Sequence, residues 1–228
     1  MGKEVIKIGI AISSHNRPEV SRQTFDILDK LRPKNSLIGL VDDASINPPF
    51  GFSNSYINQY RFERHVGVSM VKNKCLELLY SACCTHFFLF DDDCRPVLAN
   101  WWKPYINSRL EHATWTFDRP LVSEVENQYR EFEKPNGCMM YFTRTAVNTI
   151  GGWDMSFTGY GYEHVNVSDR AFNAGLTPRR YVDVWHNSPL FELADCQSSF
   201  TPEDRACIPS NFKLYQEKYL SKEFKPFK

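Results

Sequence analysis

Short apolar runs alternate with segments of helical spacing along the first hundred residues. The runs are continuous in apolar character, which is typical of strands covered on both faces, and the segments between them show the period of amphipathic helices. The pattern predicts strands at residues 5–13, 37–41, 60–62 and 86–90, and helices at residues 18–31 and 68–82. This order predicts an α/β fold with a mostly parallel sheet flanked by helices.

Polar clusters follow three of these strands. They are Ser14 to Arg17, Asp42 and Asp43, and Asp91 to Asp93. Ligands of open α/β sheets bind beyond the carboxyl ends of the strands. We therefore expect the three clusters to border one crevice.

The second half of the chain is less regular. Its pattern predicts helices at residues 101–112, 144–150 and 163–174, strands at 113–117, 137–142 and 179–184, and a partly ordered loop at 121–136. Without a Gly- or Ser-rich linker or an internal repeat, a single domain is expected.

The charge balance bears on the partners. Lys and Arg together number 27, as do Asp and Glu, so the formal net charge is zero. Domains that hold nucleic acid usually carry a basic excess, so a nucleic-acid acceptor is disfavoured. Aromatic residues make up 14% of the chain. Composition alone favours a core role for them over a platform for stacking sugars.

The cysteines and the hydropathy indicate the compartment. The seven cysteines are an odd number without a CxxC pair, which indicates reduced thiols and matches no zinc-site spacing. The chain shows neither a signal-peptide pattern nor an apolar run long enough to span a bilayer. These features predict a soluble, cytoplasmic protein with no membrane span.

Three adjacent carboxylates, Asp91, Asp92 and Asp93, are the strongest chemical feature. Like charges this close repel one another unless a cation is present, and oxygen ligands suit Mn²⁺ or Mg²⁺. The alternative is an acidic turn that caps the next element. Position at the predicted ligand edge favours the metal site.

Two further features lie in the second half. Four glycines and several aromatics occupy residues 151–162, and Glu163 follows at a predicted helix start, where a carboxylate is favoured. His186 follows the predicted strand at 179–184 and could complete a carboxylate metal site, although a lone histidine is more often structural.

The order of four segments resembles that of the GT-A glycosyltransferases. The segments are IAISSHNR, VDDAS, FFLFDDD and NGCMMYFTRTAVNTIGGWDMSFTGYGYEH. The last segment is similar to one shared by galactosyl- and N-acetylgalactosaminyltransferases, and the chain as a whole resembles these and the family 2-like transferases. The resemblance covers about residues 5–190. It implies a GT-A domain at 1–190, with a nucleotide-binding half at about 1–95, an acceptor half at about 96–190, and a C-terminal extension at 191–228 packed on the domain.

The resemblance also implies residue roles. The nucleotide would lie along Ser14, Asn16 and Arg17, with its base on Asp42, and the segment holding Arg64, Lys72 and Asn73 would close over base and ribose. Asp91 would face the ribose, and the metal would be bound by Asp91, Asp93 and His186, with Asp92 as the alternative if the register shifts by one. Sugar or acceptor would contact Trp153, Gly159, Tyr160 and Gly161.

The chain departs from the family at Glu163 and His164, where inverting relatives carry Glu-Asp. The catalytic base is then Glu163, which the helix start favours, or His164, with Asp154 and Asp169 as second choices. The implied reaction is metal-dependent transfer of a hexose from a nucleoside diphosphate sugar, with a UDP-sugar as the expected donor, to an acceptor hydroxyl with inversion. A sugar nucleotidyltransferase and a non-catalytic sugar-binding module are the alternatives, although the nucleotidyltransferase should show an early Gly-rich phosphate loop.

Overall fold

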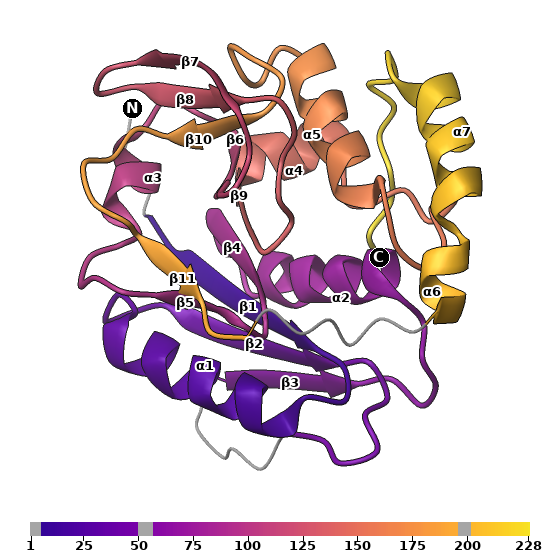
Figure 1. The fold of residues 1–228 in the computed structure, drawn as a ribbon. Helices are drawn as coiled ribbons and strands as arrows, with labels where there is room; N and C mark the ends of the chain where they lie inside the picture. Colours follow the sequence, from indigo (N-terminus) through magenta and orange to yellow (C-terminus); the bar gives the residue numbers. More distant parts are fainter. Residues whose placement is uncertain (1–5, 50–56, 196–201) are drawn as a thin grey trace.

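A six-stranded sheet organises the molecule. The computed structural model describes residues 6–49, 57–195 and 202–228 (Figure 1). The strand order is β3-β2-β1-β4-β9-β6. These strands are β1 (Ile8–Ser14), β2 (Leu37–Asp42), β3 (Ile57–Arg61), β4 (His86–Asp91), β6 (His112–Thr114) and β9 (Met139–Thr143). β3, β2, β1 and β4 run parallel and β9 runs against them, so the expected α/β fold with a mainly parallel sheet is confirmed.

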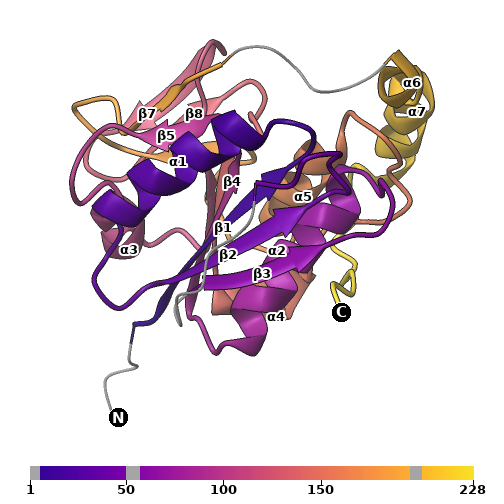
Figure 2. The same cartoon turned by 90° about the horizontal axis from the view of Figure 1, so that it is seen from below.

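Helices cover both faces of this sheet. In β1, Ile8, Ile10 and Ile12 belong to the cluster that includes α1 (Pro18–Leu31), whereas Ala11 faces a second cluster with α2 (Val68–Ser81). Figure 2 shows α1 and α2 on opposite sides of the strands. The second cluster also contains residues of α4 (Arg144–Ile150) and α5 (Glu163–Asn173). Apolar side chains on both faces explain why the strands are apolar throughout.

Two expectations for the second half were wrong. The helix expected at residues 101–112 is only α3 (Lys103–Asn107), because His112 already pairs with Phe142 as part of β6. Residues 121–136, expected as a loop, contain the hairpin of β7 (Leu121–Val125) and β8 (Tyr129–Phe132). β10 (Val182–Val184) pairs with β8 to make a three-stranded sheet.

A small sheet and the C-terminal segment complete the fold. β5 (Cys94–Pro96) pairs with β11 (Phe191–Leu193), directly after the three carboxylates. α6 (Pro202–Ala206) and α7 (Ile208–Lys218) follow, and α7 lies beside α5 (Figure 1). The tail returns to the domain, where the Gly152 N–H donates to the Lys225 carbonyl at 2.8 Å.

The described part of the chain holds no helix long and apolar enough to cross a membrane. Its cysteines are all free thiols, and Cys196 lies outside the described residues.

Candidate functional site

A cavity of about 760 Å³ opens at the carboxyl ends of β1, β2 and β4. The parallel register pairs Ser14 with Asp42 and Ser13 with Asp91, which brings the three polar strand ends to one edge. The cavity is lined from both halves of the chain, and among the residues expected to form the site it contains Ser14, Arg17, Lys72, Asp91, Asp92, Asp93, Tyr160, Gly161, Glu163 and His164.

Arg17 compensates two of the three adjacent carboxylates. Its Nη1 lies 2.8 Å from Asp92 Oδ1 and 3.1 Å from Asp93 Oδ2, and the Ser14 hydroxyl donates to Asp92 Oδ2 at 2.8 Å. Burial raises the pKa of Asp92 to about 7, while Arg17 and Ser14 act in the opposite direction. Asp92 therefore has both oxygens bound within the protein, and it is the least suited of the three to bind a metal.

Lys72 compensates the third carboxylate. This lysine is 1% exposed in α2, and its Nζ lies 2.6 Å from Asp91 Oδ1. Burial acts to lower the pKa of Lys72, but Asp91 outweighs it and the pKa is raised. The Asp91 side chain is 36% exposed and faces the cavity.

Asp42, expected at the nucleobase, is placed elsewhere. It is fully buried, and its carboxylate accepts from the Ser45 N–H at 3.0 Å and pairs with Arg61 at 3.2 Å. The next residue, Asp43, lines the cavity instead. Asp42 does not line the cavity because the alternation at the end of β2 turns its side chain inward.

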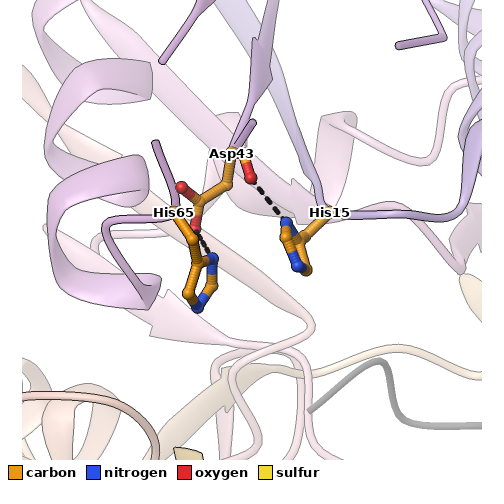
Figure 3. A group of neighbouring side chains, drawn as sticks. All are labelled: His15, Asp43 and His65. Atoms are coloured by element: carbon orange, nitrogen blue, oxygen red, sulfur yellow. Dashed lines mark hydrogen bonds and ion pairs between the residues drawn. The ribbon is translucent and has the colours of Figure 1, made fainter. Parts of the chain in front are cut away.

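His15, Asp43 and His65 form a group that sequence analysis missed (Figure 3). Their ligand-type atoms lie within 4.8 Å of one another, the one such group of three found among the described residues. Both histidines bond to the same aspartate: His15 Nδ1 lies 2.5 Å from the Asp43 carbonyl oxygen, and His65 Nδ1 lies 2.9 Å from Asp43 Oδ2. His15 and Asp43 are adjacent in sequence to expected site residues, but no sequence pattern linked His65 to them.

Glu163 and His164 line the cavity from the start of α5. Glu163 is 2% exposed, and its Oε2 has no hydrogen-bond partner within the described structure. The Trp153 indole N–H donates to His164 Nδ1 at 3.0 Å. An indole nitrogen can only donate, so Nδ1 must be the accepting nitrogen. The proton of the neutral ring is then on Nε2, which lies 3.4 Å from Glu163 Oε1.

This tautomer separates the roles of the two residues. Burial lowers the pKa of His164, partly offset by Glu163, so the ring is favoured in its neutral form. With Nδ1 bonded to Trp153 and Nε2 carrying a proton toward Glu163, His164 has no lone pair available for a substrate. Glu163 does, through Oε2.

Several expected site residues do not line the cavity. His186 accounts for the failure of the expected metal triad: its Nδ1 lies 2.7 Å from the Ser188 carbonyl, its Nε2 lies 3.8 Å from Asp183, and within the described residues it forms no ligand group with Asp91 and Asp93. β10 ends at Val184, and His186 lies two residues beyond it, where its ring bonds to nearby backbone.

Further expected site residues also lie outside the cavity lining. Asn73 bonds to the backbone N–H and carbonyl of Trp153, whose side chain is buried in the core. The Asn16 amide donates to His15 Nε2 at 2.9 Å. Arg64 is exposed on the segment before α2, and Gly159 lies against the backbone of Gly67.

The second choices for the base are both occupied by cations. Lys218 lies 2.6 Å from Asp154, and Arg180 lies 2.9 Å from Asp169. The cavity also has lining residues that the sequence did not indicate, among them Arg119 and Lys134 on loops and Arg205 in α6.

Comparison with solved structures identifies the architecture. S. aureus TarS, in complex with UDP-GlcNAc, matches 86% of this chain with a TM-score of 0.61 and 11% identity. GalNAc-T7, with UDP, GalNAc and Mn²⁺, matches 80% with a TM-score of 0.56 and 14% identity. The mannosyltransferase PcManGT of Pyrobaculum calidifontis, with GDP-Man and Mn²⁺, matches 72% with a TM-score of 0.53 and 12% identity. The chain has the GT-A fold.

This GT-A chain spans 60%, 43% and 51% of the lengths of those three structures. No family model matches the sequence. A curated protein of Acanthamoeba polyphaga mimivirus, named an uncharacterized glycosyltransferase, is 26% identical over 97% of this chain and 94% of its own length.

Proposed function

We propose that the protein is a metal-dependent glycosyltransferase that moves a hexose from a nucleoside diphosphate sugar to an acceptor hydroxyl. Glu163 carries the proposal. A buried carboxylate oxygen without a donor costs free energy, and this one lines the same cavity as Asp91 and Asp93. A hydroxyl group of a bound acceptor supplies the missing donor.

Asp91 and Asp93 fit a divalent cation that prefers oxygen ligands. Both carboxylates line the cavity, and their charge is at present compensated by Lys72 and Arg17. Mn²⁺ or Mg²⁺ held there would act as a Lewis acid that stabilises the leaving diphosphate. Arg17 and Lys72 line the same cavity and add positive charge beside it.

The nucleobase end is assigned to Asp43, in place of Asp42, together with His15 and His65. These residues line the cavity on the side of β2, and the Asp43 carboxylate is fixed by the Val66 and Gly67 N–H groups at 2.7 and 3.0 Å. A UDP-sugar is the proposed donor, because TarS and GalNAc-T7 are complexes with UDP-GlcNAc and UDP.

Transfer follows as a single displacement. Glu163 accepts the acceptor hydroxyl's proton, the acceptor oxygen forms its bond to the anomeric carbon, and the bond from that carbon to the diphosphate breaks. This sequence inverts the anomeric centre. His164 donates its Nε2–H toward Glu163 and positions the carboxylate, so it acts through Glu163 and not on the substrate.

The division of the chain follows the site. We place the nucleotide-binding half at about residues 1–95 and the acceptor half at about 96–190, with Tyr160 and Gly161 beside the acceptor. Residues 191–228 form the C-terminal extension, which contributes Arg205 and Ile208 to the cavity wall.

A donor panel tests the proposal. UDP- and GDP-sugars are incubated with the protein and Mn²⁺, and release of nucleoside diphosphate is measured without an acceptor and with simple glycosides. The account predicts slow, Mn²⁺-dependent release from one class of donor. Pyrophosphate release from a nucleoside triphosphate and a sugar phosphate would instead identify a nucleotidyltransferase, and sugar binding with no nucleotide binding would identify a lectin-like module.

A further inference from the structure

One aspartate orients two imidazole rings in the same way. His15 and His65 come from the end of β1 and the segment before α2, and their ring centroids lie 4.3 Å apart with an interplanar angle of 38°. His15 Nδ1 bonds to the Asp43 carbonyl, and His65 Nδ1 bonds to the Asp43 carboxylate. Figure 3 shows both rings extending from Asp43 toward the same side.

These bonds determine the tautomers. A carbonyl or carboxylate oxygen accepts, so each Nδ1 carries the proton and each neutral ring has its lone pair on Nε2. The Asn16 amide donates to His15 Nε2 at 2.9 Å, in agreement with an accepting nitrogen there. Both Nε2 atoms lie at the ends of the rings away from Asp43 (Figure 3).

This arrangement is the one that histidine metal ligands adopt. A ligating imidazole donates its other N–H to a carboxylate or a backbone carbonyl, which sets its tautomer and orientation. Here Asp43 provides both acceptors, and its carboxylate is itself held by the N–H groups of Val66 and Gly67. The groups that usually orient histidine metal ligands are therefore present, and the two Nε2 atoms point to the same side (Figure 3).

We propose that His15 and His65 bind a late first-row divalent cation such as Zn²⁺ through Nε2, with Asp43 as the orienting group. Imidazole nitrogen suits Zn²⁺, Ni²⁺ and Cu²⁺, whereas Mn²⁺ and Mg²⁺ prefer the oxygen ligands that Asp91 and Asp93 offer. The cation would displace the Asn16 amide and complete its coordination with water. One cavity thus holds two sites of different metal preference.

The site has a functional consequence that rests on the proposed function. His15, Asp43 and His65 line the end of the cavity assigned to the nucleobase. A cation bound there occupies that space, so it should compete with the nucleotide. Zn²⁺ would then be an inhibitor acting at a place distinct from the Mn²⁺ site.

Metal titration tests the site without any activity assay. Tag-free protein is titrated with Zn²⁺ by calorimetry and with Co²⁺ by visible absorption. The Co²⁺ spectrum reports nitrogen coordination. Binding to a cysteine thiolate would instead add the charge-transfer band of a cobalt–sulfur bond. The variants are His15→Gln, His65→Gln and Asp43→Asn, with His186→Gln as the matched control, because His186 is also a partly exposed histidine bonded to a carbonyl and near an aspartate.

The expected result is one Zn²⁺ per chain in the wild type and in His186→Gln. Either single histidine variant should lose at least about tenfold in affinity, and loss of the orienting Asp43 should cost about 10- to 100-fold. The Co²⁺ spectrum should lack the sulfur band. Equal affinity in wild type and both histidine variants, or no Zn²⁺ binding in the wild type, would overturn the site.

The competition is measured separately, by titrating UDP in the presence and absence of Zn²⁺, with Mn²⁺ present in every titration. Weaker UDP binding with Zn²⁺ in the wild type, absent in His65→Gln, supports the competition, and equal UDP affinity with Zn²⁺ bound overturns it. Failure of the wild type to bind UDP at all, in the absence of Zn²⁺, would count against the proposed function, while the Co²⁺ spectrum still decides the metal site.

Discussion

The pair Glu163 and His164 allows the catalytic base to be assigned by two matched substitutions. Glu163→Gln keeps the shape of the side chain but replaces the accepting Oε2 with an amide, so a hydroxyl proton has nowhere to go. His164→Asn keeps an acceptor near Nδ1 for the Trp153 indole and removes only the N–H directed at Glu163. Both replacements fit the space of the original side chain, so the fold should survive.

The structure predicts different losses of transfer rate for the two variants. Loss of a general base typically costs about 10²- to 10⁴-fold in rate, or about 3 to 5 kcal/mol in the barrier. The contact from His164 Nε2 to Glu163 Oε1 is long, at 3.4 Å. A net hydrogen-bond contribution of about 1 kcal/mol corresponds to roughly fivefold in rate, so His164→Asn should be active.

The assay is single-turnover transfer at saturating donor, with nucleotide affinity measured in parallel. Both variants should bind the nucleoside diphosphate as the wild type does, because the proposed mechanism assigns both residues to the acceptor and not to the nucleotide. An active Glu163→Gln together with an inactive His164→Asn would refute the tautomer argument and make His164 the base.

Three further predictions concern stability and nucleotide binding. Burial lowers the pKa of His112 from 6.5 to about 4, so between these pH values the unfolded chain binds the proton more tightly than the folded protein does. The free energy of unfolding should therefore fall by about 3 kcal/mol as the pH drops from 6.5 to 4. Urea titrations should show no such loss in His112→Asn when its stability is compared with its own value at pH 7. A Cβ at Gly137 would lie 2.0 Å from His164 Cδ2, so Gly137→Ala should lower the free energy of unfolding by about 1–3 kcal/mol, and an unchanged urea midpoint would contradict that packing. Asp43→Asn should weaken nucleoside diphosphate binding about tenfold or more, as measured by calorimetry, whereas the surface control Asp26→Asn should bind normally.

The first half of the fold could be predicted from the sequence because each element has a clear pattern of apolar residues, continuous in the strands and periodic in the helices. β1, β2 and β4 carry continuous apolar runs, and both faces of these strands are indeed buried. The hairpin of β7 and β8 carries no such signal. Leu121 is 51% exposed and Val122 is 59% exposed, so no apolar face marks β7.

The site was predictable where it follows strand ends and not where it depends on side-chain direction. Asp91 to Asp93 and Glu163 line the cavity as the motif order implied. Asp42 and Asp43 differ only in which side of the chain they face, and a sequence pattern does not resolve a shift of one residue at a strand end.

His65 and His186 show a second limit. Both are single histidines on irregular segments. The tertiary structure brings His65 to Asp43, whereas His186 bonds to the carbonyl of Ser188, two residues further along the chain. Similarly, the tautomer of His164 depends on Trp153, eleven residues away in sequence, whose indole contact comes from the fold.

The central claim is that this cavity binds a nucleoside diphosphate through a metal held by Asp91 and Asp93. The direct test is a calorimetric titration of UDP into the wild type and Asp93→Ala, each with and without Mn²⁺, with thermal unfolding to show that both are folded. The account predicts binding to the wild type that depends on Mn²⁺ and is lost in Asp93→Ala. Nucleotide affinity that is the same in both proteins with Mn²⁺ present would contradict it.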